Sequence, residues 1–370
     1  MKQFYSLLLL LVTITVSAQI PSGYYNSATG SGYTLKTQLK QIIDNSNDGL
    51  SPEYTSTDLG YTALYTTYEL SDIDLYYENN GTLLDMYSEN PNGADVYEYT
   101  YGSSQQDDGT LGTIEGQRFN REHIVPQAVF NGGSPMKNDA HFVVPSDKYV
   151  NGKRDNFPFG IVQNATFNFT NGSKRGNNLN SGYSAGYTNT VFEPIDEFKG
   201  DIARMIFYFV TRYEDGLTSF DAYDMFDRSA SKAFDDTFLN ILYTWHLQDP
   251  VSTREIDRNN AIYGRQNNRN PYIDHPEYIY NIWQNDLSVG EFETVDAIKM
   301  YPNPSNGNTV TIVARENLSV EIYDVLGKKI KMQNITSSQN KLNISGLSKG
   351  LYLVRFTSST GSTTKKLIKS

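Results

Sequence analysis

Apolar and polar positions follow two different patterns along the chain. In the longer N-terminal part, several segments carry apolar residues at helical spacing, and Pro194–Tyr213 is the strongest of them, with Ile202, Met205 and Phe209 on one face. From Met300 onwards, short runs of β-forming residues alternate with turns rich in Gly, Asn and Ser. We therefore expect an α+β domain, followed by a small all-β sandwich domain.

The same periodicities predict most of the other elements. Helices are expected at Thr34–Asn45, Tyr61–Tyr68, Phe234–Leu247 and Ser252–Tyr263. Strands are expected at Leu83–Ser88 and, in the C-terminal part, at Val310–Val313, Val320–Tyr323, Leu351–Phe356 and Lys365–Ile368. The segment Asn164–Tyr187 is rich in Gly, Asn and Ser and is predicted to be a long surface loop.

A strand–loop–strand–helix pattern precedes the strongest helix. The run Glu122–Val129, interrupted by Pro126, suits one short strand with an irregular continuation, and His141–Pro145 suits a second strand. Asp147 is a good N-cap for a helix that would then carry Asn151. The polar residues of this pattern are the candidates for chemistry.

Composition divides the chain into four segments. Residues 1–18 contain a lysine, an apolar run and small residues, which is the pattern of a signal peptide. Residues 19–286 form the α+β domain, residues 287–299 an acidic linker, and residues 300–370 the all-β domain. The leader predicts export, and a mean hydropathy of −0.51 argues against a transmembrane segment in the mature protein.

Charge and cysteine content narrow the function classes. The 370 residues contain no cysteine, which excludes disulfides, thiolate metal sites and a cysteine nucleophile. The net charge of −11 is unfavourable for a nucleic-acid partner. However, basic residues outnumber acidic ones between Glu115 and Arg175, so the region of the strand–loop–strand–helix pattern is locally basic.

The polar residues of this pattern suit phosphodiester hydrolysis. Such a reaction needs a base to activate water, a cation to neutralise developing charge, and donors to hold the phosphate. His123 is suited to the base role, and Glu122 and Asn151 offer the hard oxygen ligands that Mg²⁺ prefers. Adjacent residues on a regular strand point to opposite faces, so Glu122 and His123 share a site only if the backbone bends there. A structural Glu–His pair is the alternative.

The other polar residues of the pattern are open to two interpretations. Arg154 would share a helix face with Asn151 and could bind a phosphate, but a solvated arginine is an equal alternative. His141 alone is more typical of a core histidine than of a ligand, and Arg258 alone is more typical of an ion-pair partner.

The motifs that carry these residues resemble the endonuclease I family, whose members have a His-Me finger (ββα-metal) site. The resemblance covers about residues 30–285 and rests on Arg121–Pro126, Asp139–His141, Tyr149–Gly160, Trp245–Ser252 and Asn268–Asp274. It implies that His123 is the general base and that Glu122 and Asn151 hold Mg²⁺, with Mn²⁺ or Ca²⁺ able to substitute. A phosphate-binding arginine is also implied, with Arg121, Arg154 and Arg258 as candidates. His141 and Asn156 are expected to contact the site residues and hold them in position. Unlike members that contain cysteine, this chain has no disulfides.

The C-terminal part resembles a different family, the type A sorting domain of the type IX secretion system. The resemblance rests on Met300–Gly307, Tyr323–Gly327, Leu347–Val354 and the terminal Lys365–Lys369. It implies a partner in the outer-membrane secretion machinery and a secreted or cell-surface location. A carbohydrate-binding or adhesive β-sandwich is the alternative.

Together, these observations predict a secreted, Mg²⁺-dependent, nonspecific endonuclease that hydrolyses DNA and is expected also to hydrolyse RNA, leaving 5′-phosphate ends. Two alternatives remain at this point. One is a non-catalytic surface or adhesion protein, and the other is a phosphodiesterase acting on small nucleotides.

Overall fold

The chain folds into two compact units, Met1–Gln284 and Asn285–Ser370. The computed structural model describes residues 20–44, 46, 55–287, 298–314, 317–324, 328–336, 339–357 and 362–370. The predicted signal peptide, residues 1–18, lies outside these residues. Residues 288–297, which make up most of the predicted linker, also lie outside them. Within the described residues, no helix has the length and apolar character needed to cross a membrane.

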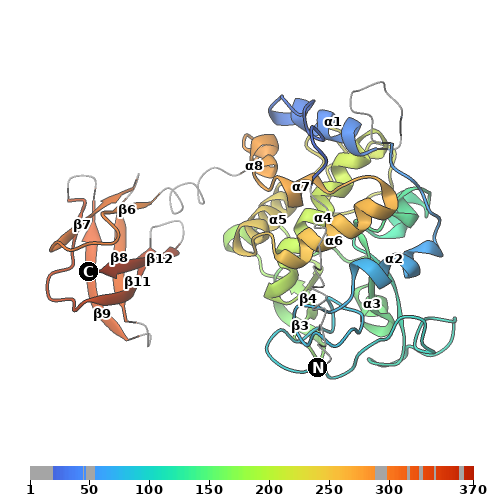
Figure 1. Cartoon of the computed structure of the whole chain (residues 1–370), viewed down its shortest axis with the longest axis horizontal. Helices are drawn as coiled ribbons and strands as arrows, with labels where there is room; N and C mark the ends of the chain where they lie inside the picture. Colours follow the sequence, from blue (N-terminus) through green and yellow to red (C-terminus); the bar gives the residue numbers. More distant parts are fainter. Residues whose placement is uncertain are drawn as a thin grey trace, which may run out of the picture. The chain divides into compact units, whose positions relative to one another are not determined.

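The first unit contains more helix than strand, and α4 (Lys199–Arg212) is its centre. All of its residues are buried, and it contacts α1, α5 and α7 (Figure 1). The apolar periodicity of Pro194–Tyr213 therefore marks the main buried helix, although regular α-helix begins only at Lys199, after a 3-10 turn at η4 (Asp196–Phe198). The other helices are α1 (Gly32–Ile43), α2 (Ala63–Ser71), α3 (Lys148–Arg154), α5 (Asp236–Gln248), α6 (Thr253–Gln266), α7 (Pro271–Asp274) and α8 (Glu277–Trp283).

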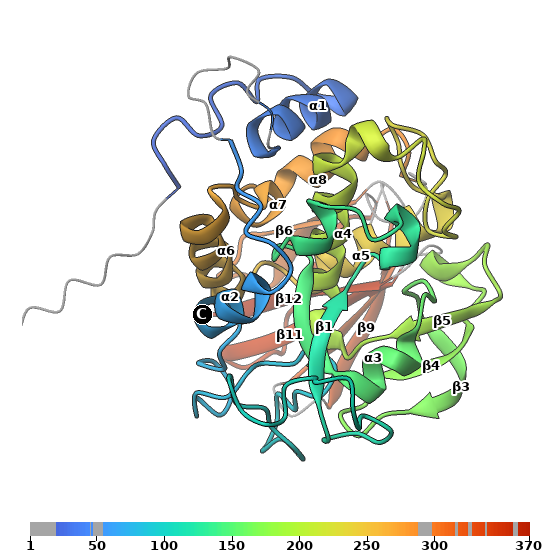
Figure 2. The same ribbon diagram turned by 90° about the vertical axis from the view of Figure 1, so that its right-hand side faces the viewer.

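The predicted strand–loop–strand–helix pattern is present, but the first strand lies earlier than predicted, because Gln127–Phe130 form the 3-10 helix η1. β1 (Phe119–His123) pairs antiparallel with β2 (Val143–Asp147), with Glu122 opposite Val144 and His123 opposite Val143. The helix α3 follows β2 directly, and its N-cap Asp147 accepts a hydrogen bond from Val150 N at 2.8 Å. Figure 2 shows β1 beside α3, which brings the end of the strand near the helix.

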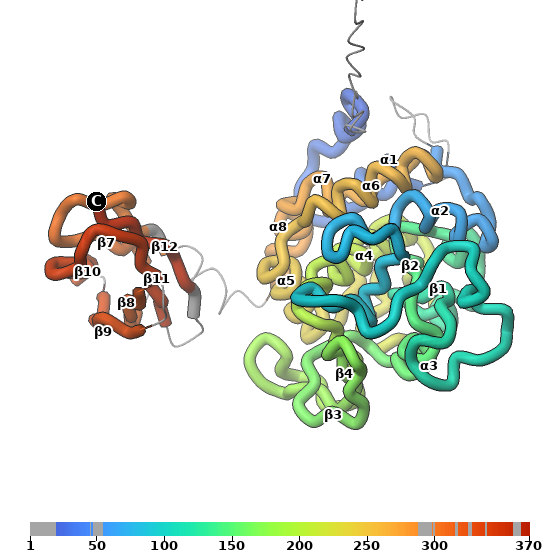
Figure 3. Tube along the Cα trace, turned by 60° about the horizontal axis from the view of Figure 1, so that its bottom comes forward, coloured from blue at the N-terminus to red at the C-terminus, as the bar shows by residue number. Residues whose placement is uncertain are grey.

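The segment predicted as a long loop, 164–187, is instead partly a β-hairpin. β3 (Val162–Asn168) pairs with β4 (Lys174–Asn178), which pairs with β5 (Thr190–Glu193). Composition was misleading because glycine has a structural role here: a Cβ on Gly176 would lie 2.0 Å from Asn164 O, so only glycine lets the strands approach. Figures 1 and 3 place β3 and β4 at the end of the unit opposite α1 (Figure 3).

The strand predicted at Leu83–Ser88 does not form. Leu83 makes isolated bridges to Ile73 and Tyr99, and the chain then turns. The Asp85 carboxylate accepts hydrogen bonds from Tyr87 N at 2.9 Å and from Ser88 Oγ at 2.6 Å, so the aspartate competes with strand pairing.

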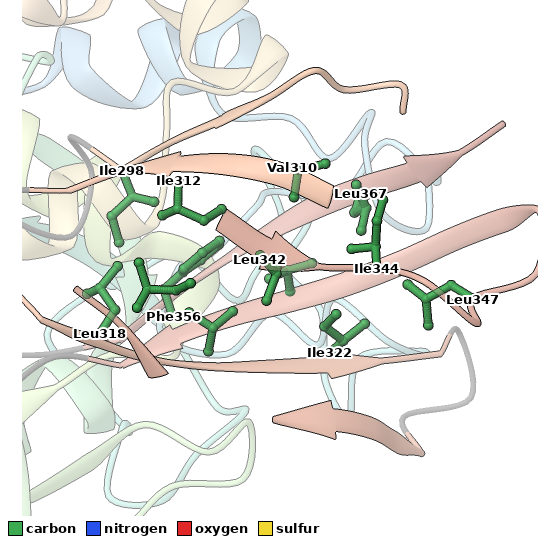
Figure 4. Close-up of a cluster of buried hydrophobic side chains, with 13 residues drawn as sticks. Ile298, Val310, Ile312, Leu318, Ile322, Leu342, Ile344, Leu347, Phe356 and Leu367 are labelled. Carbon is green, nitrogen blue, oxygen red and sulfur yellow. The ribbon is translucent and has the colours of Figure 1, made fainter. Parts of the chain in front are cut away.

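The second unit is a sandwich of two small antiparallel sheets. One sheet has the order β10-β7-β6 and the other β12-β11-β8-β9. Their inner faces supply a common apolar core, with Ile312 and Leu342 from one sheet and Ile322 and Phe356 from the other (Figure 4). The four predicted strands are confirmed, and three others accompany them in the part of the unit that the structure describes. The strands are β6 (Lys299–Tyr301), β7 (Thr309–Val313), β8 (Leu318–Tyr323), β9 (Lys329–Ile335), β10 (Lys341–Asn343), β11 (Gly350–Thr357) and β12 (Ser362–Lys369).

Candidate active site

A cavity of about 250 Å³ lies along β1 and the end of α3. β1 pairs with β2 in a two-stranded sheet, and on its other side Phe119 makes an isolated bridge to Gln106. The adjacent residues Glu122 and His123, near the end of the strand, both line the cavity. The lining residues are Tyr61, Asp107, Asn120, Arg121, Glu122, His123, Pro126, Gln127, Ala128, Asn151, Arg154, Asp155 and Asn156.

His123 is buried and held in one tautomer. Its Nε2 lies 3.1 Å from Lys137 O, and since a carbonyl only accepts, Nε2 carries the proton. Nδ1 is therefore the acceptor nitrogen, and Gln127 Nε2 donates to it at 3.3 Å. Burial lowers the pKa of His123 to about 4, and the positive charges of Arg121 and Lys137 add to this effect. The ring is thus an unprotonated base at neutral pH.

Glu122 is a buried carboxylate with two protein partners. Tyr87 donates to its Oε1 at 2.9 Å, and Arg154 Nη1 lies 3.4 Å from the same atom. Burial raises the pKa of Glu122 to about 7, although Arg154 and Tyr87 oppose the rise. A second cation at this carboxylate would favour its ionised form.

Asn151 lies one turn before the end of α3 and is half-buried. Its Nδ2 donates to Asn120 Oδ1 at 2.8 Å, which leaves the carbonyl oxygen Oδ1 as the free end of the side chain. Glu122 and Asn151 together offer hard oxygens to one cavity, and this donor set fits a divalent cation such as Mg²⁺.

The three candidate arginines have different surroundings. Arg121 is half-buried in the cavity wall, donates to Tyr61 O at 3.1 Å, and lies 3.5 Å above the Tyr61 ring. Arg154 also lines the cavity but is buried, and it donates to His123 O at 3.2 Å and to Ile124 O at 2.7 Å.

Arg258 and His141 lie away from this cavity. Arg258 is buried in α6, where it donates to Asp72 Oδ1 at 2.7 Å and to Ala140 O at 2.6 Å. His141 is buried against Tyr208, with Nε2 3.0 Å from Asn268 O. Neither side chain lines the cavity, whereas the exposed Asn156 does.

Several cavity residues were not singled out from the sequence. Asn120 and Gln127 flank the Glu–His motif, so their closeness in the chain was an available signal. Tyr61, Tyr87 and Lys137 reach the site from separate segments, and the sequence patterns singled out none of them as a site residue. Lys137 also lies over the Tyr61 ring, with Nζ 4.6 Å from its centroid.

Comparison with known proteins identifies the family of each unit. The chain belongs to the Endonuclease I family, whose match spans residues 31–277, and a secretion system C-terminal sorting domain matches residues 299–370. It is therefore a nuclease, secreted or displayed at the cell surface, with a nucleic acid as substrate.

Two relatives make the relationship more specific. An extracellular ribonuclease of Bacillus amyloliquefaciens is 32% identical over 276 residues, covering 73% of this chain and 81% of the relative. An extracellular ribonuclease of Bacillus subtilis (strain 168) is 31% identical over 269 residues, covering 70% of this chain and 78% of the relative. These findings confirm both predicted families and remove the non-catalytic surface protein from consideration.

Proposed function

We propose that this protein is a secreted, Mg²⁺-dependent endonuclease that hydrolyses RNA and DNA with little sequence preference, through a His-Me finger site. The observation that carries the proposal is the joint presence of Glu122, His123 and Asn151 in one cavity, on a β-hairpin followed by a helix. The names of the two Bacillus relatives support RNA as a substrate.

His123 would act as the general base through Nδ1. Its Nε2–H is fixed on Lys137 O, so Nδ1 is the nitrogen that can take a proton from an attacking water. The position of Gln127 Nε2 shows that a hydrogen-bond donor fits against Nδ1. The negative charge of a bound phosphodiester would raise the pKa of His123 from about 4 towards neutrality, which makes the ring a stronger base once substrate is present.

Glu122 and Asn151 would hold the cation. When bound, Mg²⁺ supplies neutralisation of the charge that develops on the phosphate and on the leaving oxygen. The chain's own contribution is orientation, because Tyr87 fixes the carboxylate and Asn120 fixes the carboxamide.

Arg121 is the arginine best placed for a phosphate oxygen. It lines the cavity, and among the described residues its guanidinium donates to the Tyr61 carbonyl. Lys137 contacts the same tyrosine ring, so both cations lie close to Tyr61 and act on His123. Arg154, by contrast, is proposed to be structural because backbone carbonyls occupy its terminal nitrogens.

In the proposed reaction, the oxygen of water forms a bond to phosphorus and its proton moves to Nδ1 of His123. The bond from phosphorus to the 3′-oxygen breaks, and the leaving oxygen is protonated from solvent. The products are a 5′-phosphate and a 3′-hydroxyl end. Because all the contacts are to phosphate, water or the cation, they carry no sequence information.

The test is cleavage of supercoiled plasmid and of ribosomal RNA by the purified protein, with Mg²⁺ and with EDTA. We expect both polymers to be cut with Mg²⁺ and neither with EDTA, and His123→Ala to abolish cleavage without unfolding the protein. Cleavage by His123→Ala within a few-fold of the parent would refute the base assignment. Dinucleotides serve as the comparison substrate, since faster cleavage of dinucleotides than of polymers would favour the small-nucleotide phosphodiesterase instead.

A further inference from the structure

A group of acidic side chains outside the cavity lies on the segment between α2 and β1. Ligand atoms of Asp74, Glu78 and Glu89 all lie within 4.8 Å of one another. We propose that these three residues bind a Ca²⁺ ion that fixes the segment from Asp72 to Tyr99. This site is separate from the one at Glu122 and Asn151, and it does not depend on the proposed function.

Asp74 is the fixed centre of this group. It is buried, and its Oδ1 accepts hydrogen bonds from Tyr76 N at 3.1 Å and Tyr77 N at 3.0 Å. Its Oδ2 accepts from Glu78 N and Asn79 N, each at 3.0 Å. The backbone from Tyr76 to Asn79 thus wraps around the Asp74 carboxylate, and this turn brings the side chain of Glu78 close to it.

Glu89 supplies an independent observation that points to a ligand. Its side chain is 1% exposed, and its buried Oε1 has no hydrogen-bond partner among the described residues. Leaving a buried carboxylate oxygen without a partner is unfavourable, and proteins usually pair such a group or place it on a metal. A cation held with Asp74 and Glu78 would supply the missing partner.

The electrostatics of Glu89 agree with a cation site. Burial raises the pKa of Glu89 to about 9. The neighbouring charges that act on it most strongly are all negative and add to the rise, and they belong to Asp95, Glu78, Asp74 and Asp85. A divalent cation would convert this mutual repulsion into attraction to a common centre.

The chemistry of the group favours Ca²⁺ over other metals. All ligands are carboxylate oxygens, which excludes a preference for soft metals. Ca²⁺ accepts six to eight oxygens in flexible geometry, including water, whereas Mg²⁺ needs a compact octahedron. The chain is secreted and has no cysteine, so a cation that links Asp74 to Glu89 would stabilise this segment where a disulfide cannot.

The segment also carries a residue of the proposed active site. Glu89 N donates to Asp85 O at 2.9 Å, and the Asp85 carboxylate accepts from Tyr87 N at 2.9 Å and from Asp147 N at 2.7 Å. Tyr87 in turn donates to Glu122. Fixing Glu89 would therefore help to keep Tyr87 in place.

The test uses the full-length chain with Glu122→Gln and Asn151→Ala, so that the proposed catalytic cation site does not contribute. Thermal unfolding is measured in EGTA and in millimolar Ca²⁺, and Tb³⁺ emission excited through tyrosine reports a lanthanide near Tyr76 and Tyr77. We expect Ca²⁺ to raise the unfolding midpoint by several degrees and to displace Tb³⁺, and Mg²⁺ at the same concentration to do neither.

Glu89→Gln added to this background should remove both effects, and Glu78→Gln should weaken Ca²⁺ binding at least ten-fold. Glu69→Gln is the matched control, since it removes an equal charge from an exposed position on α2 and should keep both effects. In EGTA at neutral pH, Glu89→Gln should unfold near the midpoint of the background protein, because burial and the neighbouring carboxylates keep Glu89 neutral and the carboxamide changes no charge. The proposal fails if Ca²⁺ shifts no midpoint, if Glu89→Gln keeps the shift, or if Mg²⁺ matches Ca²⁺.

Discussion

Arg121 and Arg154 both line the cavity, yet we propose opposite roles for them, and substitution by methionine should separate these roles. Arg154→Met would leave His123 O and Ile124 O without their buried donor. It would also leave the buried Glu122 carboxylate without its cation, 3.4 Å away. Removing one partner of a buried ion pair costs about 3–5 kcal/mol. We therefore expect Arg154→Met to lower the free energy of unfolding by about 4 kcal/mol.

Arg121→Met should behave in the opposite way. Its guanidinium is half-buried and makes one hydrogen bond to a carbonyl plus contacts with the Tyr61 and Tyr65 rings, so its loss should cost about 1 kcal/mol of stability. If it binds the phosphate, kcat/KM should fall by about 30-fold, which corresponds to about 2 kcal/mol of transition-state stabilisation.

The chain offers a selective probe for this comparison. Its two tryptophans, Trp245 and Trp283, are both buried in the first unit, so tryptophan fluorescence during urea unfolding reports that unit alone. On a Glu122→Gln background, the cost of Arg154→Met should shrink by about 2 kcal/mol, because the uncompensated charge is gone. An Arg154→Met protein with the parent's unfolding curve and no activity would refute the assignment, since it would place Arg154 on the substrate.

Three further predictions concern metal use, pH and packing. Glu122→Gln and Asn151→Ala should each raise the Mg²⁺ concentration for half-maximal cleavage at least ten-fold, and unchanged titration curves would count against them as ligands. Burial lowers the pKa of His141 to about 4, so the unfolded chain takes up a proton at this histidine before the folded chain does as the pH falls below 6.5. Between pH 7.5 and pH 5, the parent should therefore lose about 2 kcal/mol more stability than His141→Gln, as measured by urea unfolding at both pH values. Gly200→Ala should destabilise the first unit by about 2 kcal/mol in thermal unfolding, because the new Cβ would lie 2.0 Å from Asp249 O. Gly264→Ala in α6 should stabilise the unit by about 0.5 kcal/mol, because a Cβ there meets nothing within 4 Å.

Local signals were sufficient for the core of the site. Asp147 as an N-cap and the apolar run before it predicted β2 and α3, and the β-type runs after Met300 predicted β7, β8, β11 and β12. These predictions held because each depends on residues within one element, where spacing and capping decide the local conformation.

Contacts between distant segments were beyond reach of the sequence patterns. Nothing near Tyr87 indicates that its hydroxyl meets Glu122, and the run that contains it was mistaken for a strand because Asp85 was not recognised as a turn former. Arg258 could not be separated from Arg121 by spacing, since its partner Asp72 lies at the far end of the domain's sequence. The same limit applies to Glu89, whose lack of a partner is visible only in three dimensions.

Both ends of the helix that presents Asn151 are anchored. At its start, the Asp147 carboxylate caps α3 through Val150 N. At its last residue, Arg154 binds the carbonyls of His123 and Ile124, so the helix end is tied to the end of β1. The position of the Asn151 carboxamide relative to His123 is therefore set by contacts at both sides of it.

A second set of contacts joins these two anchors into a closed ring. Arg154 approaches Glu122, Glu122 accepts from Tyr87, and the backbone of Tyr87 is held by Asp85. Asp85 also accepts from the backbone of Asp147, at the start of α3. Because each member of the ring is buried, loosening one contact would move both proposed cation ligands together. This makes the segment from Asp72 to Tyr99, and with it the proposed Ca²⁺ site, a support of the cavity, although the segment itself does not line the cavity.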